Sequence, residues 1–376
     1  MAGRGPMRAA PSPERATMNG TEKNDKAADF ANYFCTYAFL YHQKEMLSDR
    51  VRMEAYYNSV FKNAHHFQGK VVLDVGTGSG ILAIWAAQAG ARRVYAVEYT
   101  DMAKHAAKLV AANKMDHIVE VIQGSVEEID LPEKVDIIIS EWMGYFLLRE
   151  SMLDSVLVAR DKWLKPGGAM YPSHARMWLA PIKSGMGEHK MQDYEASMND
   201  WVHFTQNTRH AFGVDMSTLS NSYREEQVKY FLQTSLWQSL YPSQVVGQPA
   251  LVKEIDCLTV TLDDVKAVSA NFQLPVFDGE TRVSGFAGWF DVRFQGSPSQ
   301  AADETVELTT APSINDTTHW GQQVFLLHPP LHVRDNDVVH GSILMTRSKT
   351  NHRLMDVVIK HAIGKGAETA SAFHIE

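Results

Sequence analysis

The feature that most constrains the fold is an alternation of apolar patterns between residues 70 and 172. Residues 71–75 form a short apolar run typical of a buried strand, and a glycine-rich turn at 76–80 follows directly. Residues 81–89 carry a helical pattern that Gly90 closes. Further strands are predicted at 94–98, 118–122, 135–140 and after the Pro166-Gly167-Gly168 turn, with another helix at 102–113. Strands that alternate with helices predict a parallel sheet covered on both faces, a Rossmann-like α/β domain.

The pattern changes after Pro172, where short strand-like runs recur and helical signals are sparse. These runs lie at 177–180, 255–262, 283–294, 324–327, 338–346 and 355–360. Such spacing predicts an antiparallel sheet or β-barrel. Residues 186–240 are an exception because they are rich in helix formers. We expect them to form a helical arm.

The domain organisation follows from these changes and from the first residues. Residues 1–29 contain no Val, Ile, Leu or aromatic residue, so we expect this tail to be disordered. The chain of 376 residues is long enough for two domains. We predict a nucleotide-cofactor domain over 30–172 and a β-barrel domain over 173–376, with the arm at about 186–240.

Composition excludes several classes of function. The 36 basic residues are outnumbered by 44 acidic ones, so a net charge of −8 gives no field that would draw the chain onto nucleic acid or a membrane. No apolar run approaches the ~18–20 residues of a membrane span. Two cysteines, Cys35 and Cys257, are too few for a disulfide framework, and no Cys/His cluster has zinc spacing. We expect a reduced compartment, cytoplasm or nucleus, and no metal.

The glycine turn indicates which cofactor the first domain would bind. Glycines between a strand and a helix let backbone approach a ligand closely, and Glu98 ends the next strand, where it could bind ribose hydroxyls. The third glycine, Gly80, comes one residue earlier than in the dinucleotide fingerprint. This spacing resembles S-adenosylmethionine enzymes, whose cationic cofactor suits the nearby Asp74. The alternative is a tight turn with no ligand.

An acidic loop follows the predicted strand at 135–140. Glu141 and Glu150 lie nine residues apart, beyond the carboxyl end of a strand, where ligands bind in open α/β sheets. Two carboxylates at one site favour a cation, and a planar guanidinium matches them best. The loop has no Asn/Asp-Pro-Pro-Tyr stretch of the kind found in nucleobase methylases.

Four segments together resemble the protein arginine methyltransferases, over about residues 30–376. They are an aromatic signature at 33–37, the strand and turn at 72–80, the double-glutamate loop at 140–150 and the Thr318-His319-Trp320 loop. The resemblance implies transfer of methyl groups from S-adenosylmethionine to protein arginine, without a metal. It also implies a homodimer formed through the arm, with histone tails and Gly/Arg-rich proteins as substrates.

The resemblance further implies roles for individual residues. Those implied to bind the cofactor are Gln43, Arg52, Asp74, Gly76, Gly78, Glu98, Val126 and Glu127. In that set Arg52 would hold the methionine carboxylate, Glu98 the ribose, and Val126 with Glu127 the adenine. Gln43 stands where many relatives carry a His.

The remaining implied residues belong to the acceptor site. Glu141 and Glu150 would hold the substrate guanidinium, and Asp49 with His319 would accept the released proton. The substrate pocket would be shaped by Tyr37, Met46, Met152 and Trp320. In the family, crowding by two methionines such as Met46 and Met152 accompanies asymmetric dimethylation, which is type I chemistry.

Alternatives remain at three points. The enzyme could methylate another amine or a nucleobase, or the chain could be a scaffold that binds the cofactor without catalysis. Phe231, Leu236, Trp237 and Leu240 could belong either to the core of the barrel or to the arm. We expect them to dock on a second subunit.

Overall fold

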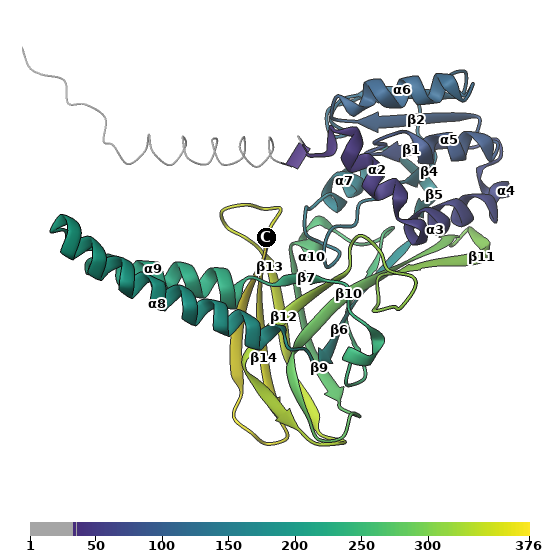
Figure 1. The fold of residues 1–376 in the computed structure, drawn as a ribbon. Helices are drawn as coiled ribbons and strands as arrows, with labels where there is room; N and C mark the ends of the chain where they lie inside the picture. The colour runs from purple at the N-terminus through teal and green to yellow at the C-terminus, as the bar shows by residue number, and fades with distance from the viewer. Residues whose placement is uncertain (1–32, 35) are drawn as a thin grey trace, which may run out of the picture.

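The computed structural model describes residues 33, 34 and 36–376, so the expected disorder of residues 1–29 and the site of Cys35 lie outside the described part. A parallel five-stranded sheet has the order β3-β2-β1-β4-β5. Its strands are β1 Val71–Val75, β2 Arg93–Glu98, β3 Val119–Gln123, β4 Val135–Ile139 and β5 Leu164–Tyr171. Every residue of β1 is buried, because helices cover both faces of the sheet (Figure 1). The predicted Rossmann-like architecture is confirmed.

Helices connect and precede these strands. They are α2 Leu40–Ser48, α3 Arg50–Phe61, α4 Ala64–Phe67, α5 Ile81–Gln88, α6 Met102–Ala112 and α7 Leu153–Trp163. The strand order reverses at β1, which lies between β2 and β4. In such sheets a crevice opens beyond the carboxyl ends of the strands at the reversal. The glycine turn after β1 and the acidic loop after β4 therefore share one crevice.

Two antiparallel sheets form the second part of the molecule. One pairs strands in the order β7-β12-β10-β6-β8 with β11 on β10, and the other has the order β15-β14-β13-β9. The strands are β6 His174–Ile182, β7 Leu236–Gln238, β8 Ala250–Asp256, β9 Ala267–Pro275, β10 Thr281–Ser297, β11 Gln300–Thr309, β12 Gln322–Val333, β13 Val338–Arg347, β14 Met355–Ile363 and β15 Thr369–Ile375. The expected barrel-like domain is confirmed.

One predicted strand in this part is wrong. The run at 255–262 was expected to be a strand, but β8 ends at Asp256 and α10 begins at Leu262 and ends at Lys266. Thr261 caps α10 by accepting a hydrogen bond from the Asp264 N–H, and the Asp264 carboxylate accepts one from the Thr261 N–H. This capping box starts a helix at the end of an apolar run whose pattern is typical of a strand.

The expected arm is present as a pair of helices. These are α8 Met186–Phe212 and α9 Ser220–Val228, which lie side by side and project away from the barrel, with a 3₁₀ turn at Ser217–Leu219 and a π-helical turn at Lys229–Gln233 (Figure 1). The Trp201 ring stacks on the Tyr223 ring, with centroids 4.2 Å apart, and its indole N–H donates to Ser220. Within the described residues, no helix is both long and apolar enough to cross a membrane.

The arm ends earlier than the sequence predicted. Leu236 lies in β7 and pairs with Val324 of β12, so it continues a barrel sheet. Leu240 is only 2% exposed and packs in a cluster with Ile182 and Trp289. The expectation that Leu240 docks on a second subunit is wrong, because the barrel itself buries it, whereas Leu236 is only partly buried and its docking stays a prediction.

The two parts meet along an interface that positions the site. The Tyr56 ring of α3 packs edge-on against Phe294 of β10, with centroids 5.0 Å apart. Arg347 at the end of β13 forms two hydrogen bonds, of 2.6 and 2.7 Å, with the Asp154 carboxylate of α7. A forked, partly buried pair of this kind fixes orientation as well as distance. The hairpin loop between β13 and β14 is thereby held against the acidic loop.

The assignment of Leu240 to the core of the barrel has a measurable consequence. We expect Leu240→Ala to lower the free energy of unfolding by about 2–5 kcal/mol, because it leaves a cavity in a packed cluster. Urea denaturation measures this change. Val202→Ala on the exposed side of α8 is the matched control and should change stability little. An altered sedimentation coefficient with unchanged stability would instead place Leu240 in a subunit interface.

Candidate active site

A cavity of about 400 Å³ opens beyond the carboxyl ends of β1 and β2. This volume lies in the range of cofactor sites, roughly 300–1,000 Å³. Its wall contains seven of the eight residues expected to bind the cofactor: Gln43, Arg52, Gly76, Gly78, Glu98, Val126 and Glu127. It also contains residues that the sequence analysis did not assign to it, among them Phe34, Tyr99 and Ser155.

The glycine turn keeps this cavity open. Gly76 and Gly78 have φ values of +69° and +54°, a region that side chains disfavour. A Cβ atom at Gly78 would lie 2.9 Å from the Gln43 amide oxygen. Gln43 is buried and donates its amide N–H to the Tyr37 carbonyl. The turn therefore has room for a ligand only because these positions carry no side chain.

Asp74 is the exception among the expected cofactor residues. It is fully buried behind the turn, outside the residues that line the cavity, and accepts a 2.5 Å hydrogen bond from the Thr77 hydroxyl. Burial raises its pKa to about 7, although the Thr77 hydrogen bond works in the opposite direction. Asp74 thus holds the turn from behind, and its expected direct contact with the cofactor stays a prediction.

The acidic side chains expected to bind the ribose and the adenine of the cofactor are held by hydrogen bonds within the chain. Glu98 accepts hydrogen bonds from the Gly78 N–H and from both the N–H and hydroxyl of Thr100. Glu127 is exposed and accepts hydrogen bonds from Ser125 and Ser155. Burial raises its pKa, but these two hydrogen bonds outweigh it and the net effect lowers the pKa. Both carboxylates therefore accept hydrogen bonds within the chain.

The acidic loop between β4 and α7 is tightly folded. Phe146, Leu147 and Glu150 have positive φ values, and the rings and methyl groups of Phe146 and Leu147 are buried. A Cβ atom at Gly144 would overlap the Arg149 carbonyl oxygen. The loop can therefore turn back on itself only with glycine at 144, which brings Glu141 and Glu150 to the same place.

The barrel holds the second half of this loop through its β13–β14 hairpin. The Glu150 N–H donates to the Arg353 carbonyl at 2.8 Å, and the Arg353 guanidinium donates to the Glu150 carbonyl at 2.6 Å. The same guanidinium lies over the Tyr33 ring, 4.1 Å from its centroid. Sequence reasoning missed Arg353, because its partners are 203 and 320 positions away along the chain.

Both glutamates face a second cavity, of about 350 Å³, that adjoins the first. Tyr37, Met46, His319 and Trp320 also line it, as expected for the acceptor pocket. Met46 and Met152 both line the cofactor cavity beside the glutamates, and a Cβ atom at Gly76 would overlap the Met152 methyl group. The two methionines therefore narrow the space between the cofactor and acceptor cavities.

Each glutamate already has partners within the chain. Glu141 accepts hydrogen bonds of 3.1 and 2.9 Å from the Arg52 guanidinium. Glu150 accepts one of 2.6 Å from the Tyr37 hydroxyl and one of 2.9 Å from Arg149. Burial raises the pKa of Glu150, whereas Tyr37 and Arg149 lower it. Arg52, expected to bind the cofactor carboxylate, lines the first cavity together with Glu141.

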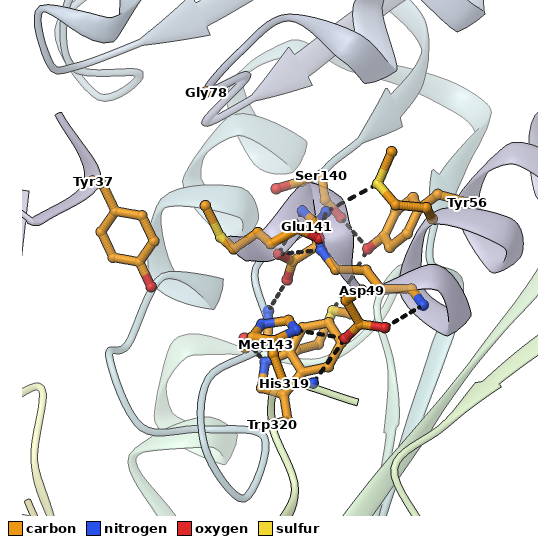
Figure 2. A network of polar contacts seen from close by, with 12 residues as sticks. Tyr37, Asp49, Tyr56, Gly78, Ser140, Glu141, Met143, His319 and Trp320 are labelled. Atoms are coloured by element: carbon orange, nitrogen blue, oxygen red, sulfur yellow. Dashed lines mark hydrogen bonds and ion pairs between the residues drawn. The ribbon is translucent and has the colours of Figure 1, made fainter. Parts of the chain in front are cut away.

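Asp49 and His319 form the expected pair (Figure 2). The His319 Nδ1 atom lies 2.7 Å from Asp49 Oδ2, which also accepts the His319 backbone N–H at 2.8 Å. Burial raises the pKa of Asp49, but the hydrogen bonds from His319 and from the Arg52 N–H outweigh it, and the net effect lowers the pKa. An ionised Asp49 fixes a proton on Nδ1 and leaves Nε2 as the acceptor.

Two tryptophans hold the His319 loop. The Trp320 indole donates to the Met143 carbonyl of the acidic loop at 2.8 Å, and Trp320 packs against His319. The Trp237 indole donates to the His319 carbonyl at 3.1 Å. Trp237 thus supports the site from β7, and because it is 48% exposed its expected docking on a second subunit stays a prediction. Among the described residues, no cluster of His, Cys, Asp or Glu could hold a metal ion.

Comparisons with known proteins agree with this geometry. Residues 174–366 match the arginine methyltransferase oligomerization subdomain, and residues 40–173 match the ribosomal protein L11 methyltransferase (PrmA) model. Protein arginine N-methyltransferase PRMT10 of Oryza sativa subsp. japonica is 61% identical, over 94% of this chain and 93% of that protein. PRMT10 of Arabidopsis thaliana is 59% identical, over 92% and 91%.

Two solved structures are also similar. That of Arabidopsis thaliana protein arginine methyltransferase 10, described as uniquely open, has a TM-score of 0.90 and 57% identity, and covers 92% of this chain and 100% of that chain. That of the Trypanosoma brucei PRMT1 enzyme–prozyme heterotetrameric complex with AdoHcy has a TM-score of 0.76 and 32% identity, and covers 91% and 100%.

The burial of Asp74 predicts a pH dependence of stability. Its folded pKa of about 7 lies above the ordinary unfolded value near ~3.9, so the fold favours the protonated form. The stability from this group is complete below the unfolded pKa and is lost as the pH rises through 7. In the ligand-free protein we expect it to fall by about 1 kcal/mol between pH 6 and pH 8.

Asp74→Asn cannot ionise and should lack this part of the pH dependence. Urea denaturation at pH 6 and pH 8 measures the difference between the variant and the natural chain. Asp278→Asn on the surface is the control, because the hydrogen bond from Lys183 lowers the pKa of Asp278 and keeps it ionised in this range. Equal pH dependence for the natural chain and Asp74→Asn would contradict the assignment.

Proposed function

We propose that this chain, which belongs to the protein arginine N-methyltransferase family, is a type I enzyme that forms monomethylarginine and then asymmetric dimethylarginine. Membership makes it an S-adenosylmethionine-dependent methyltransferase that acts on protein arginine. The observation that carries the finer proposal is the pair of buried carboxylates, Glu141 and Glu150, beside the cofactor cavity and next to Met46 and Met152.

The residues of the first cavity fit the cofactor. All of the following line the cavity: Arg52 would bind the cofactor carboxylate, Glu98 the ribose, and Val126 with Glu127 the adenine, while Gly76 and Gly78 would leave room for its methionine part. When bound, S-adenosylmethionine supplies a methyl group on a positively charged sulfur. Contact of Arg52 with a ligand carboxylate would also draw it from Glu141 and free that carboxylate for a substrate.

The glutamates would position and activate the substrate guanidinium. A guanidinium nitrogen is a poor nucleophile because its lone pair is delocalised. Two carboxylates that bind the other nitrogens draw positive charge away from the attacking one and hold it in line with the methyl donor. Burial raises the pKa of the Tyr37 hydroxyl, and the nearby Glu150 charge raises it further. The hydroxyl therefore stays protonated and keeps Glu150 in place by donating a hydrogen bond to it.

The Asp49–His319 pair would take up the proton that the product releases. His319 lines the acceptor cavity with Glu141 and Glu150, and its Nδ1 is held by Asp49, so Nε2 is the free base. A neutral His paired with a carboxylate is a suitable proton acceptor near neutral pH. This role needs no metal ion and no covalent intermediate.

Substrates and assembly follow from the charge and the arm. The net charge of −8 suits basic partners, so we propose Gly/Arg-rich segments and histone tails as substrates, with chromatin as one setting and the cytoplasm or nucleus as the location. The projecting helices α8 and α9 support a homodimer in which each arm contacts the partner subunit. The charge gives no reason to expect direct binding of nucleic acid or membranes.

Analysis of the product tests the type I assignment. The purified protein is incubated with S-adenosylmethionine and a Gly-Arg-Gly repeat peptide, and the product is fragmented by mass spectrometry. We expect loss of dimethylamine from the modified arginine, because Met46 and Met152 would direct both methyl groups to one nitrogen. Loss of monomethylamine would contradict type I chemistry. Cofactor binding without methylation of this peptide or of histones would favour the alternative of a scaffold that binds the cofactor without catalysis.

Substitution of the glutamates tests the clamp. We expect Glu141→Gln and Glu150→Gln each to reduce turnover by about 100-fold or more, the scale of losing a key electrostatic contact in a buried site. Cofactor affinity, measured by calorimetry, should change much less. Glu188→Gln on the exposed face of α8 is the matched control. Turnover close to normal in either site variant would show that the clamp is assigned to the wrong residues.

A further inference from the structure

Arg149 is an ionised group of the acceptor cavity to which the mechanism above gives no role. It precedes Glu150 in the acidic loop and donates to Glu150 Oε1 at 2.9 Å, while the Glu150 Oε2 atom faces Tyr37. Its guanidinium also lies over the Tyr145 ring, 5.4 Å from the centroid. The side chain is 21% exposed, against 15% for Glu150. These contacts fix a positive charge in the wall of the cavity.

The net charge of the cavity wall determines how Arg149 affects a bound substrate. The residues that line the acceptor cavity include two carboxylates, Glu141 and Glu150, and two guanidinium groups, Arg149 and Arg353. Leaving aside its two histidines, His42 and His319, and also Arg52, which lines the first cavity and pairs with Glu141, the described residues of the wall carry no net charge before a substrate enters. A bound substrate arginine adds one positive charge, so the occupied cavity then carries one positive charge in excess.

This excess charge acts on the residues next to the target arginine. The target guanidinium pairs with Glu150, which then neutralises Arg149 only in part. Arg149 lines the cavity and keeps 21% of its side chain exposed, so a charged substrate side chain beside the target arginine would interact with it in a partly buried site. A second cation there is repelled, and an anion is attracted.

We propose that Arg149 is a specificity-determining residue that selects arginines flanked by neutral or acidic residues over arginines flanked by lysine or arginine. The inference rests on the proposed function and narrows its substrate class. Arginines between glycines would be better acceptors than those in the densely basic parts of histone tails. The overall charge of −8 brings basic proteins to the enzyme, whereas Arg149 selects among their arginines.

Binding of matched peptides tests this selection. The probes are two glycine-rich peptides, each with one arginine, in which both neighbours of that arginine are either Glu or Lys. Their dissociation constants are measured by calorimetry on the full chain with S-adenosylhomocysteine present, at low salt because salt screens exposed charges. We expect the natural chain to bind the Glu-flanked peptide at least about tenfold more tightly.

Three variants separate charge from shape. Arg149→Met keeps an unbranched, though shorter, side chain without the charge, and should reduce the preference about tenfold. Arg149→Lys keeps the charge without the planar fork, and should retain most of the preference. Arg282→Met removes the arginine of another Arg–Glu pair, far from the cavity on the surface, and should leave the ratio unchanged. Thermal unfolding of each variant confirms that it is folded.

The outcomes are distinguishable. An unchanged ratio in Arg149→Met, an equal loss in Arg149→Lys, or tighter binding of the Lys-flanked peptide by the natural chain would overturn the inference. Because binding is measured without turnover, a natural chain that shows the expected ratio but methylates neither peptide would contradict the proposed function alone. Methylation of both peptides with a ratio that Arg149 does not affect would contradict the inference alone.

Discussion

The structure depends on three carboxylates, buried or nearly so, that each lie opposite a hydrogen-bond donor at the junction of its two parts. Glu141 faces Arg52, Glu150 faces Arg149, and Asp49 faces His319. An unpaired charge in such a place would cost several kcal/mol, so each carboxylate needs a partner before a ligand arrives. A ligand that brings a guanidinium or a carboxylate can exchange with these partners at little net cost. The site is therefore stable when empty and still adapted to a charged substrate.

Neither part of the molecule completes this arrangement alone. The parallel sheet supplies the glycine turn and, beyond β4, the acidic loop that carries both glutamates. The barrel supplies His319, and through its β13–β14 hairpin the backbone of Arg353 holds Glu150. The bidentate Arg347–Asp154 pair fixes the hairpin against α7. The second domain thus contributes to the geometry of the acceptor cavity.

Much of this could be predicted from the sequence, because local patterns decide it. The apolar runs that alternate with helical patterns predict β1 to β4, and the glycine spacing predicts the turn that leaves space for a cofactor. Three features could not be predicted, because they depend on contacts between distant residues. Asp74 lies behind its turn, Trp237 supports His319 from β7, and Leu240 belongs to the barrel. The pair of Arg149 and Glu150 is adjacent in sequence, yet only the loop fold shows that both side chains reach the acceptor cavity.

We propose that the acceptor cavity recognises a planar, charged guanidinium. The most direct measurement compares three glycine-rich peptides that differ only in the central residue, which is arginine, citrulline or lysine, by calorimetry with S-adenosylhomocysteine bound. Citrulline has nearly the shape of arginine without its charge, and lysine has the charge without the fork. We expect the arginine peptide to bind at least about tenfold more tightly than the citrulline peptide or the lysine peptide. Equal affinity for the arginine and citrulline peptides would contradict it.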